Sequence, residues 1–191
     1  TDGTEAAAPQ TQSVAEGEYY SFTSPAIEGY VPDSATTFGQ MGTEDISLKV
    51  IYSKAYKVTV HYLKADGSQM FDDVVIENLV NGDDYLVKTI PVANYTFDTE
   101  QVEGVIAGAD VEVTVTYSLR KYTLTIRYQY ADGSSAGEDY VAEITCGESY
   151  SVATPSIAGY TPDKAVVSAD SIRKNTEVTV TYTAEAAETE Q

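Results

Sequence analysis

The chain has 191 residues, and its 30 acidic residues against 11 basic ones give a formal net charge of −19. This balance argues against a protein that binds nucleic acid or docks on anionic lipid, because both need clustered lysine and arginine. Hydrophobic residues make up 42% of the chain, too many for a disordered protein, yet no apolar run is long enough to cross a bilayer. We expect a folded, acidic monomer with no nucleic-acid partner and no membrane insertion.

The chain divides into linkers and repeats. Residues 1–16 are rich in alanine, threonine and glutamine without an apolar period, which predicts a linker. Residues 17–53 predict a partial first repeat, because a leading strand like those of the later repeats is missing there. Residues 54–118 and 119–183 predict a second and a third repeat, and residues 184–191 a closing linker.

The repeats follow from residues that recur at a fixed spacing. Tyr52, Tyr117 and Tyr182 lie 65 residues apart (117−52 = 65 and 182−117 = 65). The same spacing holds for Tyr30, Tyr95 and Tyr160, for Tyr20, Tyr85 and Tyr150, and for Gly17, Gly82 and Gly147. A residue that recurs in every unit more often builds the unit than performs chemistry. A residue that breaks the pattern is therefore the better candidate for specificity.

Each complete repeat begins with a predicted β-hairpin. Residues 56–62 alternate between apolar or aromatic and polar side chains, and residues 122–128 repeat the pattern, as in half-buried strands. Both run into Ala-Asp-Gly, which suits a tight reversal because glycine adopts positive φ. The second strands of the two hairpins are predicted at residues 73–79 and 140–145.

The second half of each repeat carries a tyrosine followed three residues later by an acid. These pairs are Tyr30 and Asp33, Tyr95 and Asp98, and Tyr160 and Asp163. Prolines restrict this block to turns, a short helical turn or edge segments. Asn94 stands where the other repeats have Gly29 and Gly159, which leaves the turn geometry of the middle repeat open. Closing strands with one buried face are predicted at residues 47–52, 111–117 and 177–182.

These motifs together resemble the MucBP (mucin-binding protein) repeat of Gram-positive surface proteins. The resemblance implies a β-grasp (ubiquitin-like) unit, or a close variant, whose first and last strands lie side by side and parallel. The expected fold is therefore mostly β or α+β, with small β-grasp-like repeats in an elongated tandem array. The resemblance also implies an extracellular place on the bacterial surface, with the anchor outside this sequence, and host mucin or other glycoprotein glycans as partners.

No pattern of residues indicates an enzyme. His61 is the single histidine and lies on the polar face of a predicted strand, where Arg127 is its counterpart. Neither a zinc-binding His/Cys set nor a phosphate-binding glycine loop is present. We predict no catalytic residue, no metal site and no cofactor. Calcium stays open as an alternative, because Asp66, Asp72 and Asp73 flank one hairpin, although the EF-hand spacing is absent.

The single cysteine, Cys146, cannot form an intramolecular disulfide. Its counterparts in the other repeats are Asn81 and Glu16, so the repeat does not need a thiol there. We predict a partly buried small residue rather than a reactive thiol.

Thirteen of the 16 tyrosines recur between repeats and are predicted to build core and turns. Tyr19, Tyr130 and Tyr140 do not recur, and they are the candidate ligand contacts. Sugar binding uses flat aromatic faces together with polar groups that orient hydroxyls. Tyr130 and Tyr140 fall on the two strands of one hairpin, where they either form an exposed platform or extend the core.

Two functions follow. The first is a non-enzymatic adhesion module whose weak contacts with glycans add up through multivalency. The alternative is a structural stalk that presents another domain away from the cell wall. In a stalk, parallel terminal strands would resist a pull along the chain as a shear clamp.

Overall fold

The structure is a computed structural model that describes residues 3–185, so residues 186–191 of the predicted closing linker lie outside the described residues. Within the described range every regular element is a β-strand, and no helix occurs. The first set of strands is β1 (Tyr19–Thr23), β2 (Tyr30–Pro32), β3 (Thr36–Gln40) and β4 (Tyr52–Lys54). The second set is β5 (Tyr56–Lys64), β6 (Gln69–Leu79), β7 (Asp84–Lys88), β8 (Tyr95–Phe97), β9 (Gln101–Val105) and β10 (Val111–Leu119). The third set is β11 (Lys121–Tyr130), β12 (Tyr140–Thr145), β13 (Tyr150–Ala153), β14 (Tyr160–Pro162), β15 (Val166–Ala169) and β16 (Thr176–Ala184).

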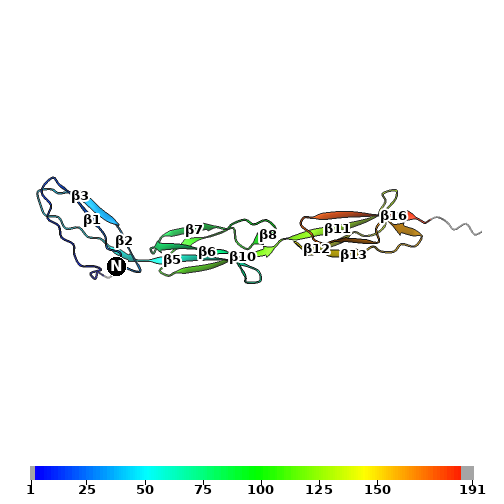
Figure 1. The fold of residues 1–191 in the computed structure, drawn as a ribbon, viewed down its shortest axis with the longest axis horizontal. Helices are drawn as coiled ribbons and strands as arrows, with labels where there is room; N and C mark the ends of the chain where they lie inside the picture. The colour runs from blue at the N-terminus through cyan, green and yellow to red at the C-terminus, as the bar shows by residue number, and fades with distance from the viewer. Residues whose placement is uncertain (1–2, 186–191) are drawn as a thin grey trace, which may run out of the picture. The chain divides into compact units, whose positions relative to one another are not determined.

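The chain is thus an all-β protein of three tandem small repeats, which can be followed by colour in Figure 1. The mostly-β expectation is confirmed, and the proline-bearing block forms the short strands β8 and β14 rather than a helical turn. The chain folds as two compact units, one of residues Thr1–Ile90 with Phe97–Tyr117 and one of Pro91–Thr96 with Ser118–Gln191.

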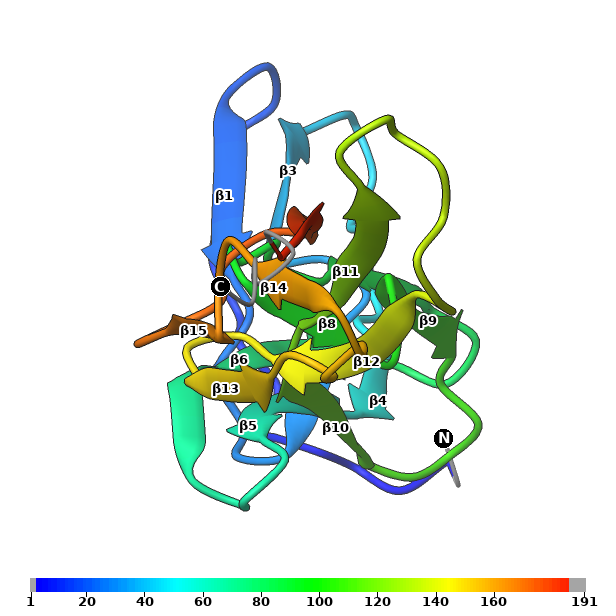
Figure 2. The same cartoon turned by 90° about the vertical axis from the view of Figure 1, so that its right-hand side faces the viewer.

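The larger sheet of each complete repeat is built around a parallel pair of strands. Its order is β6-β5-β10-β8 in the second repeat and β12-β11-β16-β14 in the third. Figure 2 labels most of these strands in a view turned by 90° from Figure 1. Val111–Tyr117 of β10 run parallel to Val58–Lys64 of β5, and β11 and β16 pair in the same way. The parallel pairing of first and last strands is therefore present. The flanking strand β6 is antiparallel to β5, as the predicted hairpin requires.

A two-stranded antiparallel ribbon accompanies each larger sheet, formed by β7 with β9 and by β13 with β15. Side chains from both sheets, together with Ile172 from the connection between β15 and β16, make up the core of the third repeat: Leu124, Ile126, Tyr128, Val167, Ile172, Val180 and Tyr182. In the second repeat Val58, Val60 and Tyr62 of β5 are fully buried, as their alternation predicts. Burying a side chain of this size contributes roughly 1.5–3 kcal/mol, so these alternating positions set the stability of the unit.

The recurring tyrosine of the closing strand makes the same hydrogen bond in all three repeats. Its hydroxyl donates to a backbone carbonyl oxygen 27 residues earlier. The bonds are Tyr52 to Pro25 at 2.8 Å, Tyr117 to Ile90 at 2.8 Å and Tyr182 to Pro155 at 2.5 Å. Burial raises the pKa of the Tyr117 and Tyr182 hydroxyls, which keeps them protonated as donors. The bond ties the closing strand to the connection that follows the first strand of the two-stranded ribbon.

The recurring acid of each repeat accepts a hydrogen bond from a backbone amide in or next to the same closing strand. Asp98 Oδ1 accepts a bond from the Thr116 amide at 3.0 Å, and Asp163 Oδ1 one from Thr181 at 2.9 Å. In the first repeat Asp33 Oδ1 accepts from the Ile51 amide at 3.1 Å. The tyrosine and the acid of each repeat thus make structural hydrogen bonds to the backbone rather than form a reactive pair.

Asn94 keeps the turn of the middle repeat in the conformation that glycine takes in the other two repeats. Its φ is 66°, close to the 77° of Gly29 and the 78° of Gly159, so the backbone takes the same left-handed conformation. Asparagine tolerates this conformation better than other non-glycine residues. Its side-chain oxygen also accepts a bond from the Tyr122 hydroxyl at 3.1 Å. The replacement therefore keeps the turn and adds a contact.

We predict that Tyr117→Phe destabilises the second repeat by about 0.5–1.5 kcal/mol, because the Ile90 carbonyl loses its donor. Calorimetry of thermal unfolding on the full chain measures the change. Tyr140→Phe is the control, since Tyr140 is 40% exposed and its variant should stay within about 0.5 kcal/mol of the wild type. Equal effects of the two substitutions would show that the hydrogen bond of the Tyr117 hydroxyl does not stabilise the repeat.

Candidate functional site

Two aromatic rings stand exposed on the outer face of the β1–β3 ribbon. Tyr19 is 79% exposed and Phe38 is 76% exposed. The register pairs Tyr19 with Gln40 and Ser21 with Phe38, so the two rings are diagonal neighbours on one face. Diagonal neighbours lie roughly 7–8 Å apart, within reach of long side chains. We call this face, with Tyr19, Ser21, Phe38 and Gln40, the aromatic face.

The aromatic face has the composition that sugar recognition needs. Its rings offer flat apolar surfaces, and Ser21 and Gln40 stand directly opposite them across the ribbon. Thr23 and Thr36 extend the same exposed face with two further hydroxyl groups. Gln40 is positioned by its Nε2 group, which donates to the Gly17 carbonyl at 2.8 Å. The face can stack on the apolar side of a sugar and exchange hydrogen bonds with its hydroxyls.

The first repeat alone carries this surface. One period after Tyr19 and Phe38 stand Asp84 and Glu103, and two periods after them stand Ser149 and Ser168. The sequence singled out Tyr19 because it does not recur, but it missed Phe38. The signal for Phe38 lies in the strand register, since only the pairing of β1 with β3 places the two rings on one face.

Tyr130 and Tyr140 are placed differently from Tyr19. The ring of Tyr130 packs on the ring of Tyr160, with centroids 4.8 Å apart, against the core of the third repeat. Tyr140 begins β12 opposite Ile126 and is 40% exposed. The register therefore does not set the two tyrosines opposite each other, and Tyr140 presents the more open ring. A role of these residues in ligand contact stays a prediction.

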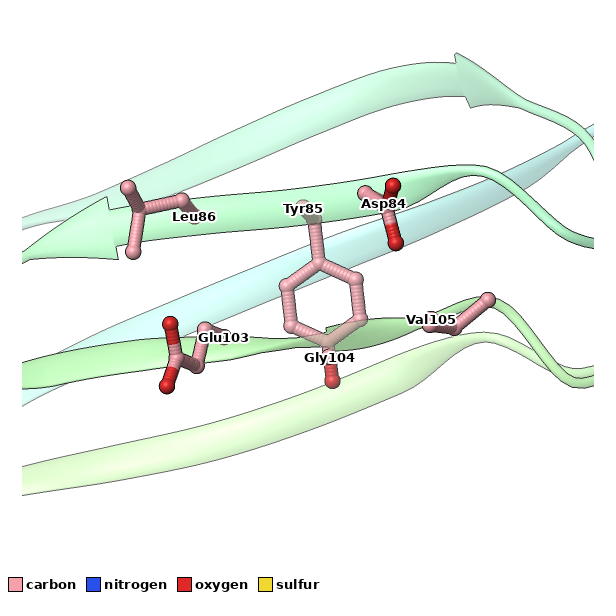
Figure 3. A pocket seen from close by; sticks show the side chains of 6 residues that line it. All are labelled: Asp84, Tyr85, Leu86, Glu103, Gly104 and Val105. Carbon is pink, nitrogen blue, oxygen red and sulfur yellow. The ribbon is translucent and has the colours of Figure 1, made fainter.

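A shallow hollow lies over the β7–β9 ribbon and is shown in Figure 3. The ring of Tyr85 reaches from β7 across β9 and lies over Gly104, its partner in the register. A methyl group on Gly104 would come within 2.5 Å of the Tyr85 hydroxyl oxygen. Tyr20 lies over Gly39 in the first repeat in the same way, whereas Tyr150 of the third repeat faces Ala169. The arrangement is a cross-strand fit of an aromatic ring over glycine.

The acids considered for calcium have structural partners. Asp66 Oδ1 accepts bonds from the Ser68 amide at 2.9 Å and hydroxyl at 2.6 Å, and these bonds lower the pKa of the Asp66 carboxyl. Asp132 and Ser134 repeat this turn. Asp73 Oδ2 lies 2.8 Å from His61 Nδ1, while Arg127, the counterpart of His61, lies 3.7 Å from Asp139. These groups close turns and link the strands of a hairpin.

Within residues 3–185 no group of three or more His, Cys, Asp or Glu side chains is arranged to hold a metal ion. Cys146 is a free thiol and only 8% exposed, so it is buried more fully than the partly buried position that the sequence predicted. Over the same described range, no helix has the length and apolar character needed to span a membrane.

Comparison with protein families identifies the repeats. The MucBP domain model matches residues 1–53, 57–118 and 123–184, so the chain belongs to the MucBP family. This family consists of adhesion-type repeat domains and is not known for enzymes. No curated protein matched the chain.

Several solved structures are similar to the chain. The type 2 repeat of the mucus binding protein MUB from Lactobacillus reuteri is 24% identical, with 68% of this chain and 100% of that chain covered and a TM-score of 0.30. A MucBP domain from Lactobacillus acidophilus is 30% identical over 35% of this chain and 92% of its own, with a TM-score of 0.27. A MucBP domain of the adhesion protein from Pediococcus pentosaceus is 23% identical over 69% and 99%, with a TM-score of 0.21.

We predict that Gly104→Ala displaces the Tyr85 ring and lowers stability by about 1–3 kcal/mol, because the added methyl overlaps the ring. Nuclear magnetic resonance of the Tyr85 ring protons reports the displacement, and calorimetry reports the stability. Ala169→Gly in the third repeat is the matched control, since Tyr150 already accommodates a methyl group there. An unmoved Tyr85 ring in Gly104→Ala would contradict the fit described above.

Proposed function

We propose that this chain is a non-enzymatic adhesion module of a bacterial surface protein, and that it binds glycans of host mucin or of another glycoprotein. The aromatic face of the first repeat is the observation that supports the proposal. Two large rings exposed by more than three quarters keep apolar surface in water, which is unfavourable, and a stacking sugar would cover that surface. Membership of the MucBP family favours the same class of ligand.

The acidic charge of the chain makes neutral sugars the better ligands within this class. With a net charge of −19, sulfated or sialylated glycans would meet repulsion at low ionic strength. The aromatic face itself carries no charged side chain at Tyr19, Ser21, Phe38 or Gln40. Neutral hexoses can therefore stack there without charge repulsion from the face itself.

We predict that the full chain binds neutral mucin-type glycans weakly, and that replacing both Tyr19 and Phe38 by alanine lowers this binding at least about tenfold. The stacking of a nucleobase on an aromatic side chain is an analogous contact and contributes roughly 1–3 kcal/mol per base to the binding free energy. A glycan array followed by titration of the best sugar measures the effect. Tyr140→Ala is the matched control, because it removes an exposed ring from another repeat.

Two outcomes would contradict this assignment. Unchanged binding by the Tyr19/Phe38 double variant, with loss in Tyr140→Ala, would move the contact to the third repeat. Absence of binding to any glycan at millimolar concentration would contradict the proposal that the chain adheres through sugars.

A spacer that withstands tension along the chain is the second candidate function, and the parallel strand pairs favour it. The chain enters each complete repeat in β5 or β11 and leaves it in β10 or β16, directly beside the entering strand. A pull on both ends loads all the hydrogen bonds between these strands together in shear. The first repeat has no such pair, because β4 joins only β2 within the described residues.

For the spacer we predict two unfolding events when the full chain is stretched by its ends in a single-molecule experiment. Each event releases roughly 60 residues, or about 200 Å of contour length, and belongs to the second or third repeat. The first repeat extends at low force and serves as the internal control. Three equal events, or none above the force of the first repeat, would contradict the clamp.

We infer that each complete repeat is a small β-grasp-like unit. The parallel first and last strands support a reduced β-grasp unit in which strands replace the usual helix. We propose a division into a linker at 1–16, a partial repeat at 17–53 and complete repeats at 54–118 and 119–183. The strand sets support its boundaries to within one residue, since β4 ends at Lys54, β10 at Leu119 and β16 at Ala184. A location on the cell surface accords with the family.

A further inference from the structure

The outer face of the β7–β9 ribbon presents two carboxylates and two apolar side chains around one hollow (Figure 3). The register pairs Asp84 with Val105 and Leu86 with Glu103, so the two acids stand on one diagonal and the two apolar residues on the other. All four residues are exposed, Leu86 by 52% and Val105 by 55%. We call the hollow between these four residues the acidic hollow.

The ribbon below the acidic hollow is built like the ribbon of the first repeat. The fit of a tyrosine over a glycine occurs in both, and both pair over five residues in equivalent registers. Only the outward side chains differ, since Asp84 and Glu103 stand one period after Tyr19 and Phe38. The same backbone therefore displays aromatic rings in one repeat and carboxylates in the next, and the two faces suit ligands of different chemistry.

Both carboxylates are open to a ligand. The Asp84 side chain has no hydrogen-bond or ion-pair partner among the described residues. Glu103 accepts one bond, which Gln101 Nε2 donates to its Oε2 at 2.9 Å, so its Oε1 stays available. Lys88 lies on the same outer face opposite Gln101, and it forms no ion pair with any residue in the described part of the chain. The two negative charges are therefore not neutralised by a cation of the repeat itself.

A guanidinium group on an aliphatic arm fits the four corners of the hollow. Diagonal neighbours lie roughly 7–8 Å apart, so Asp84 and Glu103 can bond to opposite edges of one planar guanidinium. An ammonium group is a compact point charge and does not span two such acceptors in the same way. The carbon chain of arginine packs along apolar surface while its charged end stays in water, and Leu86 and Val105 provide that surface.

We propose that the acidic hollow binds an arginine side chain of a partner protein. The net charge of −19 attracts a basic partner and repels an acidic one. The apolar corners are aliphatic, whereas a sugar ring is better matched by the flat aromatic surfaces of the first repeat. Because the hollow is shallow, a polypeptide that also contacts the neighbouring ribbon surface is a better ligand than a free small cation. This inference is independent of the glycan proposal, since the aromatic face belongs to another repeat.

The test titrates the isotopically labelled full chain with a blocked five-residue peptide that carries a central arginine between valines and threonines. We expect saturable shifts in nuclear magnetic resonance at the amides of residues 84–86 and 103–105. The same peptide with citrulline, the neutral isostere of arginine, should bind about fivefold more weakly. Two exposed ion pairs together provide about this factor.

Two double variants separate the hollow from the general charge of the chain. Asp84→Asn with Glu103→Gln should remove the preference for arginine over citrulline. Glu77→Gln with Glu112→Gln is the matched control, because it removes the same charge from exposed positions elsewhere in the second repeat and should leave the preference intact. All four side chains are exposed, so thermal unfolding should be unchanged in both variants. The alanine variant of the aromatic face should bind the peptide like the wild type, which keeps this test separate from that of the glycan proposal.

Three results would overturn the proposal. Equal losses in the two double variants would show that the overall charge attracts the peptide. Absence of localised shifts at millimolar peptide would show that the hollow does not bind arginine. The same local shifts with protonated glucosamine, but not with the peptide, would assign the hollow to a sugar instead of a protein.

Discussion

The parallel pairing of the first and last strands is the constraint on which each complete repeat depends. Parallel strands cannot be joined by a tight turn, so a long connection must leave one strand and return beside it. Here that connection holds the rest of the repeat, including the hairpin partner β6 and the ribbon of β7 and β9. The hydrogen bonds of Tyr117 and Asp98 then hold the returning strand in register.

Tyrosine serves two opposite purposes in this chain. Tyrosines that recur, such as Tyr117 and Tyr182, have 0% exposed side chains and use their hydroxyls inside the repeat. Tyr19 breaks the period and is largely exposed on a face where the next repeat carries Asp84. An acidic repeat surface stays solvated, whereas a pair of rings on the same face favours contact with a ligand.

The sequence predicted the period, the hairpins and the closing strands of the second and third repeats, because alternation and turn residues are local signals. The closing strand expected at residues 47–52 of the first repeat was wrong, since the strand there covers only Tyr52–Lys54. The parallel pairing came from the family resemblance, since no local pattern reveals which strands meet. Phe38 was missed because its partner Tyr19 lies 19 residues away and only the register brings them to one face. The packing of Tyr130 on Tyr160 was equally non-local. The left-handed turn at Asn94 depends on a conformation that few residue types adopt.

Amide hydrogen exchange on the full chain, followed by nuclear magnetic resonance, tests the central role of the parallel pair most directly. The amides of Val113 and Val115 lie in the paired strand, and those of Leu48 and Val50 occupy the same positions in the repeat without a partner strand. The account predicts exchange at least about 100-fold slower for the first two amides than for the last two. Equal protection at both places would contradict it, since the closing strand would then be stable without the strand beside it.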